Sequence, residues 1–246
     1  MSPQKIPLSL IIPCYNEADG IPQLQEKLSP LLNQLQNSYQ LELLFINDGS
    51  TDNTSSLLQQ HFPQAYCKII THQTNQNLGA AIRTGFHAAT GDIIITMDSD
   101  CTYDVHEIYN LLNLLDPHTD IVTISPYHPL GKVENIPSYR LALSKSISWI
   151  YRQLTGAHIY TFTALFRAHK KHIVKNIAFE SNNFLATAEI LIYSLLQGYT
   201  IKEQPATLHV RKYGQSKMKL FLVIKSHAKF VAKVFWMRLT GKFKKK

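Results

Sequence analysis

The chain has 246 residues, of which 45% are hydrophobic and 17% are charged. This composition excludes a disordered chain and allows one sizeable folded core. The formal net charge of +8 is unevenly spread, because the segment from residue 202 onward holds 13 Lys and Arg and one acid. A near-neutral body therefore ends in a basic segment, which suits anionic lipid, phosphate groups or nucleic acid.

The cysteines and the N-terminus indicate the compartment. Cys14, Cys67 and Cys101 are isolated and odd in number, which supports neither a disulfide framework nor a zinc site. The first apolar run is short and stops at Pro13, without the long apolar region and cleavage site of a signal peptide. We therefore expect a reducing, cytoplasmic location.

The first half of the chain alternates predicted strands with predicted helices. Short apolar runs predict strands at residues 8–12, 41–46, 67–71, 93–97 and 120–124. Apolar residues at helical spacing predict helices at residues 21–35, about 52–60, 80–89 and 105–115. This alternation predicts an α/β fold with a mostly parallel sheet, helices on both faces and right-handed crossovers.

The second half is less regular. Residues 125–137 contain three prolines and a glycine, which predicts a long loop of functional interest. Helices are expected at residues 139–154 and 184–196, and strands at residues 159–166 and 200–210. A basic loop with a glycine follows at residues 211–217.

Two carboxylates, Asp98 and Asp100, follow the fourth predicted strand. Residues i and i+2 point to the same side of a strand, and ligands of parallel sheets bind at the carboxyl ends of the strands. Two such carboxylates repel each other unless a cation lies between them, and hard oxygen ligands suit Mg²⁺ or Mn²⁺. The alternative is a solvated turn in which Asp100 or Asp104 caps the next helix.

Glycine-rich phosphate-binding motifs are absent from the sequence. No G-x-G-x-x-G follows the first predicted strand, and no G-x-x-x-x-G-K-[ST] occurs anywhere. A bound phosphate would therefore be held by a metal ion and basic side chains.

Five stretches in order resemble the family 2 nucleotide-sugar glycosyltransferases. They are Ile12-Pro13-Cys14-Tyr15-Asn16-Glu17, Asn47-Asp48-Gly49-Ser50-Thr51-Asp52, Asn77-Leu78-Gly79-Ala80-Ala81, Gly91-Asp92 and Asp98-Ser99-Asp100. The late motif Arg211-x-x-Gly214-x-Ser216-Lys217, with Ser138-Tyr139-Arg140 through Ser144, is most similar to the dolichol-phosphate mannose synthase group and its bacterial polyprenyl-phosphate relatives. The resemblance implies a GT-A type, Rossmann-like catalytic domain over residues 1–218.

The resemblance also implies roles for individual residues. The donor, a GDP- or UDP-sugar, would be bound by Pro13, Tyr15, Glu17, Asp48, Asp52, Asn77, Gly79, Asp98, Ser216 and Lys217. Asp98 and Asp100 would hold the Mg²⁺ or Mn²⁺ that bridges the diphosphate, and Arg211 would complete the catalytic set by closing over it. Arg140 and Ser144 would hold the phosphate of a lipid-phosphate acceptor.

The implied reaction is transfer of the sugar to a polyprenyl phosphate with inversion at the anomeric carbon. A lipid-phosphate oxygen is already anionic and needs no strong base, so positioning and charge stabilisation can do most of the work. Two other interpretations stay open: the same fold acting on a polysaccharide, glycolipid or other acceptor, and a non-catalytic nucleotide-binding protein.

Structural alternatives also exist for single residues. Glu17, Asp48 and Asp52 could serve only as turn and helix-cap residues. Arg140 could be a solvated helix residue, and Glu189 could be a buried acid paired with an arginine instead of a functional residue.

Two positions depart from the pattern of that group. Thr102 stands where the group usually has Gln, which puts one contact around the metal in doubt. Ser125-Pro126-Tyr127 stands where the group usually has an Arg that binds the acceptor phosphate. His128 or Lys132 is a possible substitute for that arginine.

The C-terminal segment, residues 219–246, is expected to be a basic amphipathic helix followed by a lysine tail. Lys225, Lys229 and Lys233 recur every four residues, opposite apolar and aromatic residues. Central cations cost about 2.5–3.5 kcal/mol each in a spanning helix, so we expect a helix lying on the inner face of a membrane. The alternative is a helix that covers the core with a solvated lysine face. No signature of a nucleic-acid-binding fold is present.

Overall fold

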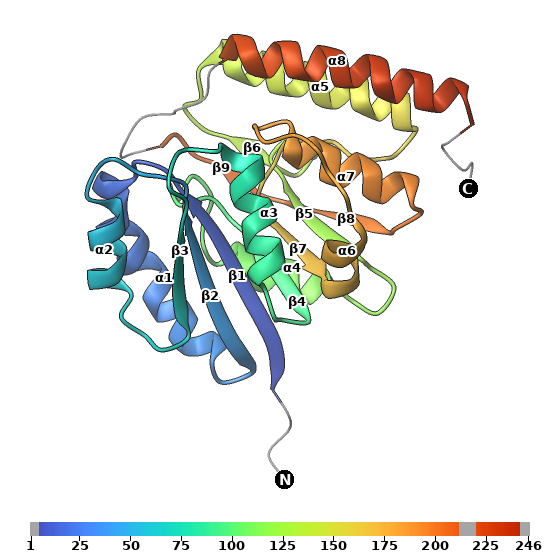
Figure 1. Cartoon of the computed structure of the whole chain (residues 1–246). Coiled ribbons are helices and arrows are strands. Elements are labelled where there is room, and N and C mark those ends of the chain that lie inside the picture. The colour runs from blue at the N-terminus through green and yellow to red at the C-terminus, as the bar shows by residue number, and fades with distance from the viewer. Residues whose placement is uncertain (1–4, 212–219, 242–246) are drawn as a thin grey trace.

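The structure of the protein, a computed structural model, describes residues 5–211 and 220–241 (Figure 1). Its centre is a seven-stranded sheet in the order β3-β2-β1-β4-β7-β5-β8. The strands are β1 (Ile6–Cys14), β2 (Tyr39–Asn47), β3 (Cys67–Thr71), β4 (Ile93–Thr96), β5 (Ile121–Ser125), β7 (Arg167–Lys170) and β8 (Ile201–Pro205). Every neighbouring pair is parallel except those of β7, which runs antiparallel to β4 and β5. The predicted mostly parallel sheet is confirmed.

Helices cover both faces of the sheet, as predicted. They are η1 (Ala18–Gly20), α1 (Ile21–Leu35), α2 (Thr54–His61), α3 (Leu78–Ala88), α4 (Glu107–Leu114), α5 (Ser138–Thr155), α6 (Lys171–Asn176), α7 (Ala186–Leu196) and α8 (Leu220–Leu239). One core cluster joins the sheet to α1, α2 and α4, and the other joins its opposite face to α3, α5, α6, α7 and α8.

The central strands are apolar throughout because both of their faces are buried. In β1, Leu8, Leu10 and Ile12 enter one core cluster, and Ile11 enters the other. All four side chains are fully buried. The continuous apolar run that predicted a strand thus reflects burial on two faces.

The predicted strand at residues 159–166 is wrong. Those residues form no regular element, and the strand is Arg167–Lys170. The segment is nonetheless largely buried. The Glu203 carboxylate takes the place of a strand partner by accepting hydrogen bonds from the backbone N–H of Tyr160 and Thr161, both at 2.9 Å. Burial favoured the same β-branched and aromatic residues that sheet pairing favours.

The predicted loop and the last predicted strand also need correction. The loop contains β6 (Lys132–Val133), which pairs in parallel with β9 (Thr207–Leu208). The predicted strand at residues 200–210 is therefore two strands, β8 in the main sheet and β9 in this small one.

The long helices α5 and α8 lie side by side across one end of the molecule (Figure 1). Phe230 and Val234 of α8 are buried, and the Tyr151 hydroxyl of α5 lies 2.8 Å from Nδ1 of His227. One face of α8 therefore covers the core, and the opposite face is exposed. No helix among residues 5–211 and 220–241 is long and apolar enough to cross a membrane.

Candidate active site

Charged side chains from three parts of the chain meet at the carboxyl edge of the sheet. Glu17 follows β1, Asp98 and Asp100 follow β4, and Arg211 follows β9. The Arg211 Nε donates to Asp100 Oδ2 at 2.9 Å, and its Nη2 donates to Glu17 Oε1 at 2.9 Å. The loops after β1 and β4 thus meet at the carboxyl edge of the sheet, where ligands of parallel sheets bind.

The cluster brings the carboxylates of Glu17, Asp98 and Asp100 together with the Arg211 guanidinium, so its carboxylates outnumber this cation. Burial alone would lower the pKa of the Arg211 guanidinium, but Asp100 and Glu17 outweigh it and raise that pKa above its usual value. Burial and the charge of Asp100 raise the pKa of the Asp98 carboxyl, against the opposing effect of Arg211. Asp98 is therefore a carboxylate that gains from a second cation nearby.

The donor set at this edge suits a hard divalent cation. Asp98 and Asp100 offer carboxylate oxygens, which Mg²⁺ and Mn²⁺ prefer. Within the described ranges, no three His, Cys, Asp or Glu side chains are grouped so that they could hold a metal ion by themselves. Further oxygens would have to come from water or from a substrate phosphate, which is the usual arrangement for Mg²⁺.

Thr102 fixes the orientation of Asp100. Its backbone N–H and its hydroxyl donate to Asp100 Oδ1 at 3.1 and 2.9 Å. Its carbonyl accepts from the His209 N–H at 2.9 Å, two residues before Arg211. Thr102 thus links the Asp-x-Asp turn to the segment that brings Arg211 to it.

The loops after β1 and β2 brace each other. The Asn16 side chain accepts from the Thr51 N–H at 2.8 Å, and the Thr54 hydroxyl accepts from the Glu17 N–H at 2.8 Å. The Asp52 carboxylate accepts from the N–H groups of Thr54 and Ala18 at 3.0 and 3.2 Å. Asp52 therefore stabilises the turn before α2, whose cap residue is Asn53, and a donor contact by Asp52 stays a prediction.

Asp48 is buried in a network of hydrogen bonds. Its Oδ1 lies 2.7 Å from His72 Nδ1 and accepts from the Gln76 N–H at 2.9 Å, and its Oδ2 accepts from the Asn75 side chain at 3.1 Å. The other ring nitrogen of His72 lies 2.9 Å from the Thr84 hydroxyl. His72 belongs to none of the five sequence motifs, although it directly follows β3 in the same way that Glu17 and Asp98 follow β1 and β4.

The remaining predicted donor residues lie around this network. Pro13 and Tyr15, at the end of β1, are partly exposed, and Asn77 is exposed just before α3. Gly79 is buried: its N–H donates to the Asn182 carbonyl at 2.8 Å, and a Cβ at Gly79 would lie 2.1 Å from the Ser181 carbonyl oxygen. Ser216 and Lys217 lie outside the described residues.

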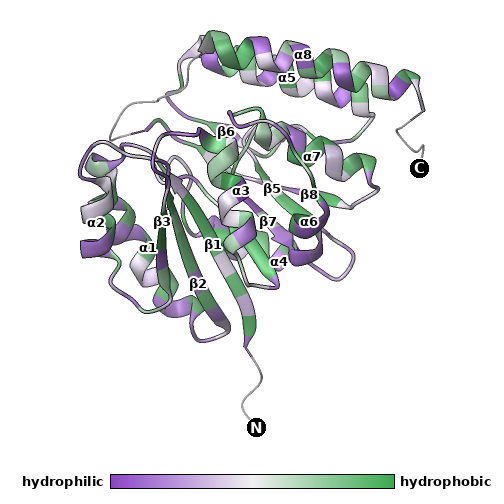
Figure 2. Ribbon diagram, viewed as in Figure 1, coloured by the Kyte–Doolittle hydropathy of each residue, from purple (hydrophilic) through white to green (hydrophobic). Residues whose placement is uncertain are grey.

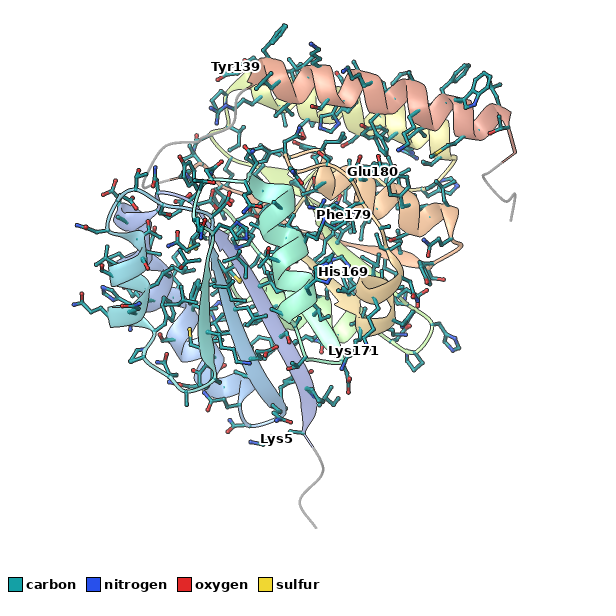
Figure 3. All side chains as sticks on the ribbon, in the orientation of Figure 1. Lys5, Tyr139, His169, Lys171, Phe179 and Glu180 are labelled. Carbon is teal, nitrogen blue, oxygen red and sulfur yellow. The ribbon has the colours of Figure 1, made fainter. Side chains whose placement is uncertain are left out.

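The two predicted acceptor residues are both on α5. Arg140 Nε donates to the Tyr139 hydroxyl at 3.2 Å, and Tyr139 marks the beginning of α5 at the edge of the molecule (Figure 3). The Ser144 hydroxyl lies 3.0 Å from that of Thr163. No hydrogen bond joins Arg140 to Ser144 within the described parts of the chain.

Arg167, at the start of β7, is a buried residue that the sequence did not reveal. The residue is 2% exposed, and its guanidinium donates to the Thr123 hydroxyl at 3.1 Å, the Phe162 carbonyl at 2.7 Å and the Thr187 carbonyl. Burial lowers the pKa of Arg167 to about 9, against the opposing charges of Glu203 and Asp98. The side chain ties β5 and the start of α7 to the irregular segment.

Glu189 is a buried structural acid, but within the described residues its hydrogen-bond partners are backbone N–H groups and not the expected arginine. Its carboxylate accepts from the backbone N–H groups of Glu180 and Ser181 at 3.0 and 2.8 Å. It therefore fixes the loop before α7, the same loop that packs on Gly79.

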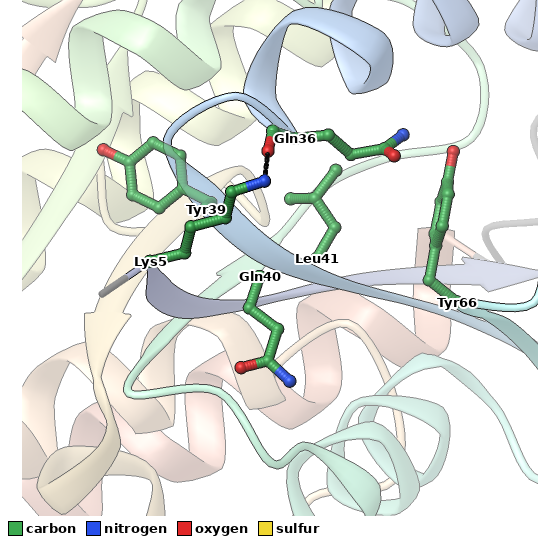
Figure 4. Close-up of a pocket in the computed structure, with 6 residues that line it drawn as sticks. All are labelled: Lys5, Gln36, Tyr39, Gln40, Leu41 and Tyr66. Carbon is green, nitrogen blue, oxygen red and sulfur yellow. Dashed lines mark hydrogen bonds between the residues drawn. The ribbon is translucent and has the colours of Figure 1, made fainter. Parts of the chain in front are cut away.

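A hollow at the opposite edge of the sheet is unrelated to the carboxylates. It is lined by Lys5, Gln36, Tyr39, Gln40, Leu41 and Tyr66 (Figure 4). These residues surround the amino ends of β1 and β2, whereas Asp98, Asp100 and Arg211 lie at the carboxyl edge. We therefore place the functional site at the carboxyl edge.

An α/β sheet with paired carboxylates and an arginine at its carboxyl edge is the arrangement expected of a nucleotide-sugar transferase. The profile of "Glycosyl transferase family 2" matches residues 9–180, more than half of the chain. The protein belongs to glycosyl transferase family 2 and is a glycosyltransferase. The resemblance drawn from the five motifs is thereby confirmed.

Similar proteins come from bacteria and archaea. The chain is 29% identical over 217 residues to a polyprenol monophosphomannose synthase of Mycolicibacterium smegmatis, covering 85% of this chain and 80% of that protein. It is 28% identical to an undecaprenyl-phosphate 4-deoxy-4-formamido-L-arabinose transferase of Yersinia enterocolitica, over 88% of this chain and 64% of that protein. It is 29% identical to a dolichol-phosphate mannosyltransferase of Pyrococcus furiosus, over 86% of this chain and 59% of that protein.

A solved structure supports the fold. Glucosyl-3-phosphoglycerate synthase from Mycobacterium tuberculosis, crystallised with Mn²⁺, UDP and glucosyl-3-phosphoglycerate, superposes with a TM-score of 0.68 at 16% identity. The match covers 95% of this chain and 80% of that one.

Proposed function

We propose that this glycosyltransferase moves a sugar from a GDP- or UDP-sugar to a polyprenyl phosphate, with inversion at the anomeric carbon. The observation that carries the proposal is the contact of Arg211 with Asp100 and Glu17 beside Asp98. Carboxylates for a divalent metal and a cation beside them are what a nucleoside diphosphate leaving group needs. The names of the three relatives, which act on polyprenol, undecaprenyl phosphate or dolichol phosphate, support the acceptor.

Each residue has a part in this mechanism. Asp98 and Asp100 would hold Mg²⁺ or Mn²⁺, which supplies charge neutralisation for the diphosphate. Arg211, with Ser216 and Lys217 from the same motif, would bind the departing phosphate oxygens. Pro13, Tyr15, Glu17 and Asp48 would frame the base and ribose, and the acceptor phosphate would attack as an oxygen anion placed by α5.

The donor side is tested by calorimetric binding of GDP-mannose, UDP-glucose and UDP-GlcNAc with and without Mn²⁺. We expect one donor to bind the native protein in a metal-dependent way, and Asp100→Ala to abolish that dependence. Equal binding by Asp100→Ala would overturn the metal assignment.

Two other functions predict different results. Transfer to a soluble sugar or a glycolipid, with none to polyprenyl phosphate, would support a different acceptor. Metal-dependent donor binding with neither transfer nor donor hydrolysis would support a nucleotide-binding protein.

We further propose that the exposed face of α8, together with that of α5, rests on an anionic bilayer at the cytoplasmic side. Apolar and charged residues alternate along both helices (Figure 2), and neither helix contains an acid. Trp149 of α5 and Trp236 of α8 are 62% and 66% exposed. Exposed tryptophans beside lysines are typical of helices that lie in a membrane interface. In this proposal residues 1–218 carry catalysis and residues 219–246 strengthen membrane attachment.

The two tryptophans of the chain make this proposal testable on each helix separately. Trp149→Phe leaves a fluorophore only on α8, and Trp236→Phe leaves one only on α5. We expect vesicles of brominated phosphatidylglycerol to quench both single-tryptophan proteins. Quenching on neither helix would remove the membrane proposal and leave the enzymatic one intact.

A further inference from the structure

The place of the missing acceptor arginine, directly after β5, is occupied by a cluster of hydroxyl groups. Tyr127 follows β5 by two residues and is partly buried. Burial raises the pKa of Tyr127 and outweighs the opposing effect of the Ser144 side chain of α5, so the Tyr127 hydroxyl stays protonated and can donate. Thr163 adds a third hydroxyl, 3.0 Å from that of Ser144.

One cation lies against this cluster. The Lys145 ammonium is 5.7 Å from the centre of the Tyr127 ring, within the range of a cation–π contact. Lys145 is exposed, and no carboxylate in residues 5–211 and 220–241 forms an ion pair with it. Its three N–H donors are thus available beside Tyr127, whereas the guanidinium of Arg140 is held against Tyr139.

The cluster lies close to the carboxylates of the donor site. Asp98 follows β4 and Tyr127 follows β5, and these two strands run in the same direction with only β7 between them, so their carboxyl ends share one edge of the sheet. A phosphate bound at Lys145 would therefore lie near the metal carboxylates, on the side of α5.

We propose that Lys145 is the cation that binds the acceptor phosphate, in place of the arginine missing after β5. The hydroxyls of Tyr127, Ser144 and Thr163 would donate to the remaining phosphate oxygens. A flexible ammonium serves as a point charge for phosphate and needs no fixed fork geometry. This inference rests on the proposed function, because it takes a phosphate monoester as acceptor. It also replaces the two substitutes suggested by the sequence, His128 and Lys132.

The test uses a water-soluble ten-carbon prenyl monophosphate, so that membrane binding does not contribute. We expect Lys145→Met to weaken calorimetric binding of this compound to the full chain about tenfold or more, since a charge-assisted hydrogen bond is lost. Lys145→Arg should retain most of the affinity. Lys175→Met, an exposed lysine of α6, is the matched control and should bind as the native protein does.

The outcomes separate the inference from the function on which it rests. If Lys145→Met binds the prenyl phosphate normally, the assignment of Lys145 is wrong and the proposed function stands. If that variant binds the prenyl phosphate normally but binds anionic vesicles weakly, the ammonium serves lipid headgroups and the assignment is again wrong. If the native protein binds a donor with Mn²⁺ but no prenyl phosphate, the acceptor class and the assignment fail together.

Discussion

The proposed donor side and the proposed acceptor side of this enzyme are built in different ways. On the donor side, the loops after β1 and β2 are joined directly to each other, as by Asn16 and Thr51. On the acceptor side, an irregular segment is held by side chains distant in sequence, such as Glu203 on Tyr160 and Thr161. Strand–loop–helix repeats therefore place donor residues through local structure, whereas the acceptor residues depend on tertiary contacts.

The largest effect is expected at Arg211, the cation of the carboxylate cluster on the proposed donor side. Arg211→Ala should lower kcat about 10²- to 10³-fold, because one cation facing the diphosphate is lost and Asp100 and Glu17 lose their shared partner. Steady-state kinetics with the donor identified by calorimetry measures this. Arg211→Lys should recover part of the rate, and an unchanged kcat for the alanine variant would show that the donor side works without this cation.

The next largest effect is expected at the contact of Gly79 with the loop before α7. Gly79→Ala should lower the free energy of unfolding by about 2–4 kcal/mol, since its Cβ would lie 2.1 Å from the Ser181 carbonyl oxygen and the backbone must move. Gly20→Ala is the control, because its Cβ would meet only the Glu17 carboxylate, at 4.0 Å. Urea unfolding compares them, and equal losses would contradict the packing argument.

The acceptor side should also make the protein sensitive to acid. Burial lowers the pKa of His169 to about 3 and that of His227 to about 4. Both are neutral in the folded and unfolded states at pH 7.5, so they then have no effect on stability. Below about pH 6.5 the unfolded state takes up protons that the folded state refuses, so stability falls as the pH falls.

At pH 5 the loss should be on the order of 1–2 kcal/mol for each histidine. Urea unfolding at pH 7.5 and pH 5 measures it. His227→Phe should reduce the difference between the two pH values, even if it lowers stability at both. An identical pH dependence in the variant would exclude His227 as a source.

The smallest effect is expected at Thr102, within the donor side. Thr102→Val keeps the shape but removes the hydroxyl that donates to Asp100 Oδ1, and should weaken Mn²⁺ binding about five- to tenfold. Mn²⁺ titration followed by electron paramagnetic resonance measures this without turnover. Thr102→Ser keeps the hydroxyl and should bind as the native protein does, and equal loss in both variants would contradict the hydrogen-bond explanation.

The sequence located the strands and loops of the proposed donor side, because their signals are local. An apolar run ending in polar residues located β1, β2 and β4, and the residues just beyond them included Glu17, Asp98 and Asp100. His72 obeys the same rule after β3 and was missed because it lies outside the recognised motifs.

The proposed acceptor side could not be predicted from local sequence signals. The segment at residues 159–166 has the composition of a strand because it is buried. Its backbone bonds to the side chains of Glu203 and Arg167, and the sequence does not indicate these distant partners. Lys145 of α5 contacts Tyr127 in the loop after β5, and no sequence spacing predicts this contact. The Asp100–Thr102 bond, by contrast, spans two residues and could have been proposed.

The antiparallel strand β7 has a consequence for how the sheet folds while the chain is being synthesised. Once residue 96 has left the ribosome, β3, β2, β1 and β4 can form a parallel sheet. The free edge of β4 then has no partner until Arg167–Lys170 is synthesised, because β5 pairs with β7 and not with β4. An open apolar edge invites pairing with other chains. We therefore expect nascent chains arrested between β5 and β7 to depend on chaperones, and chains that contain β7 to escape that dependence.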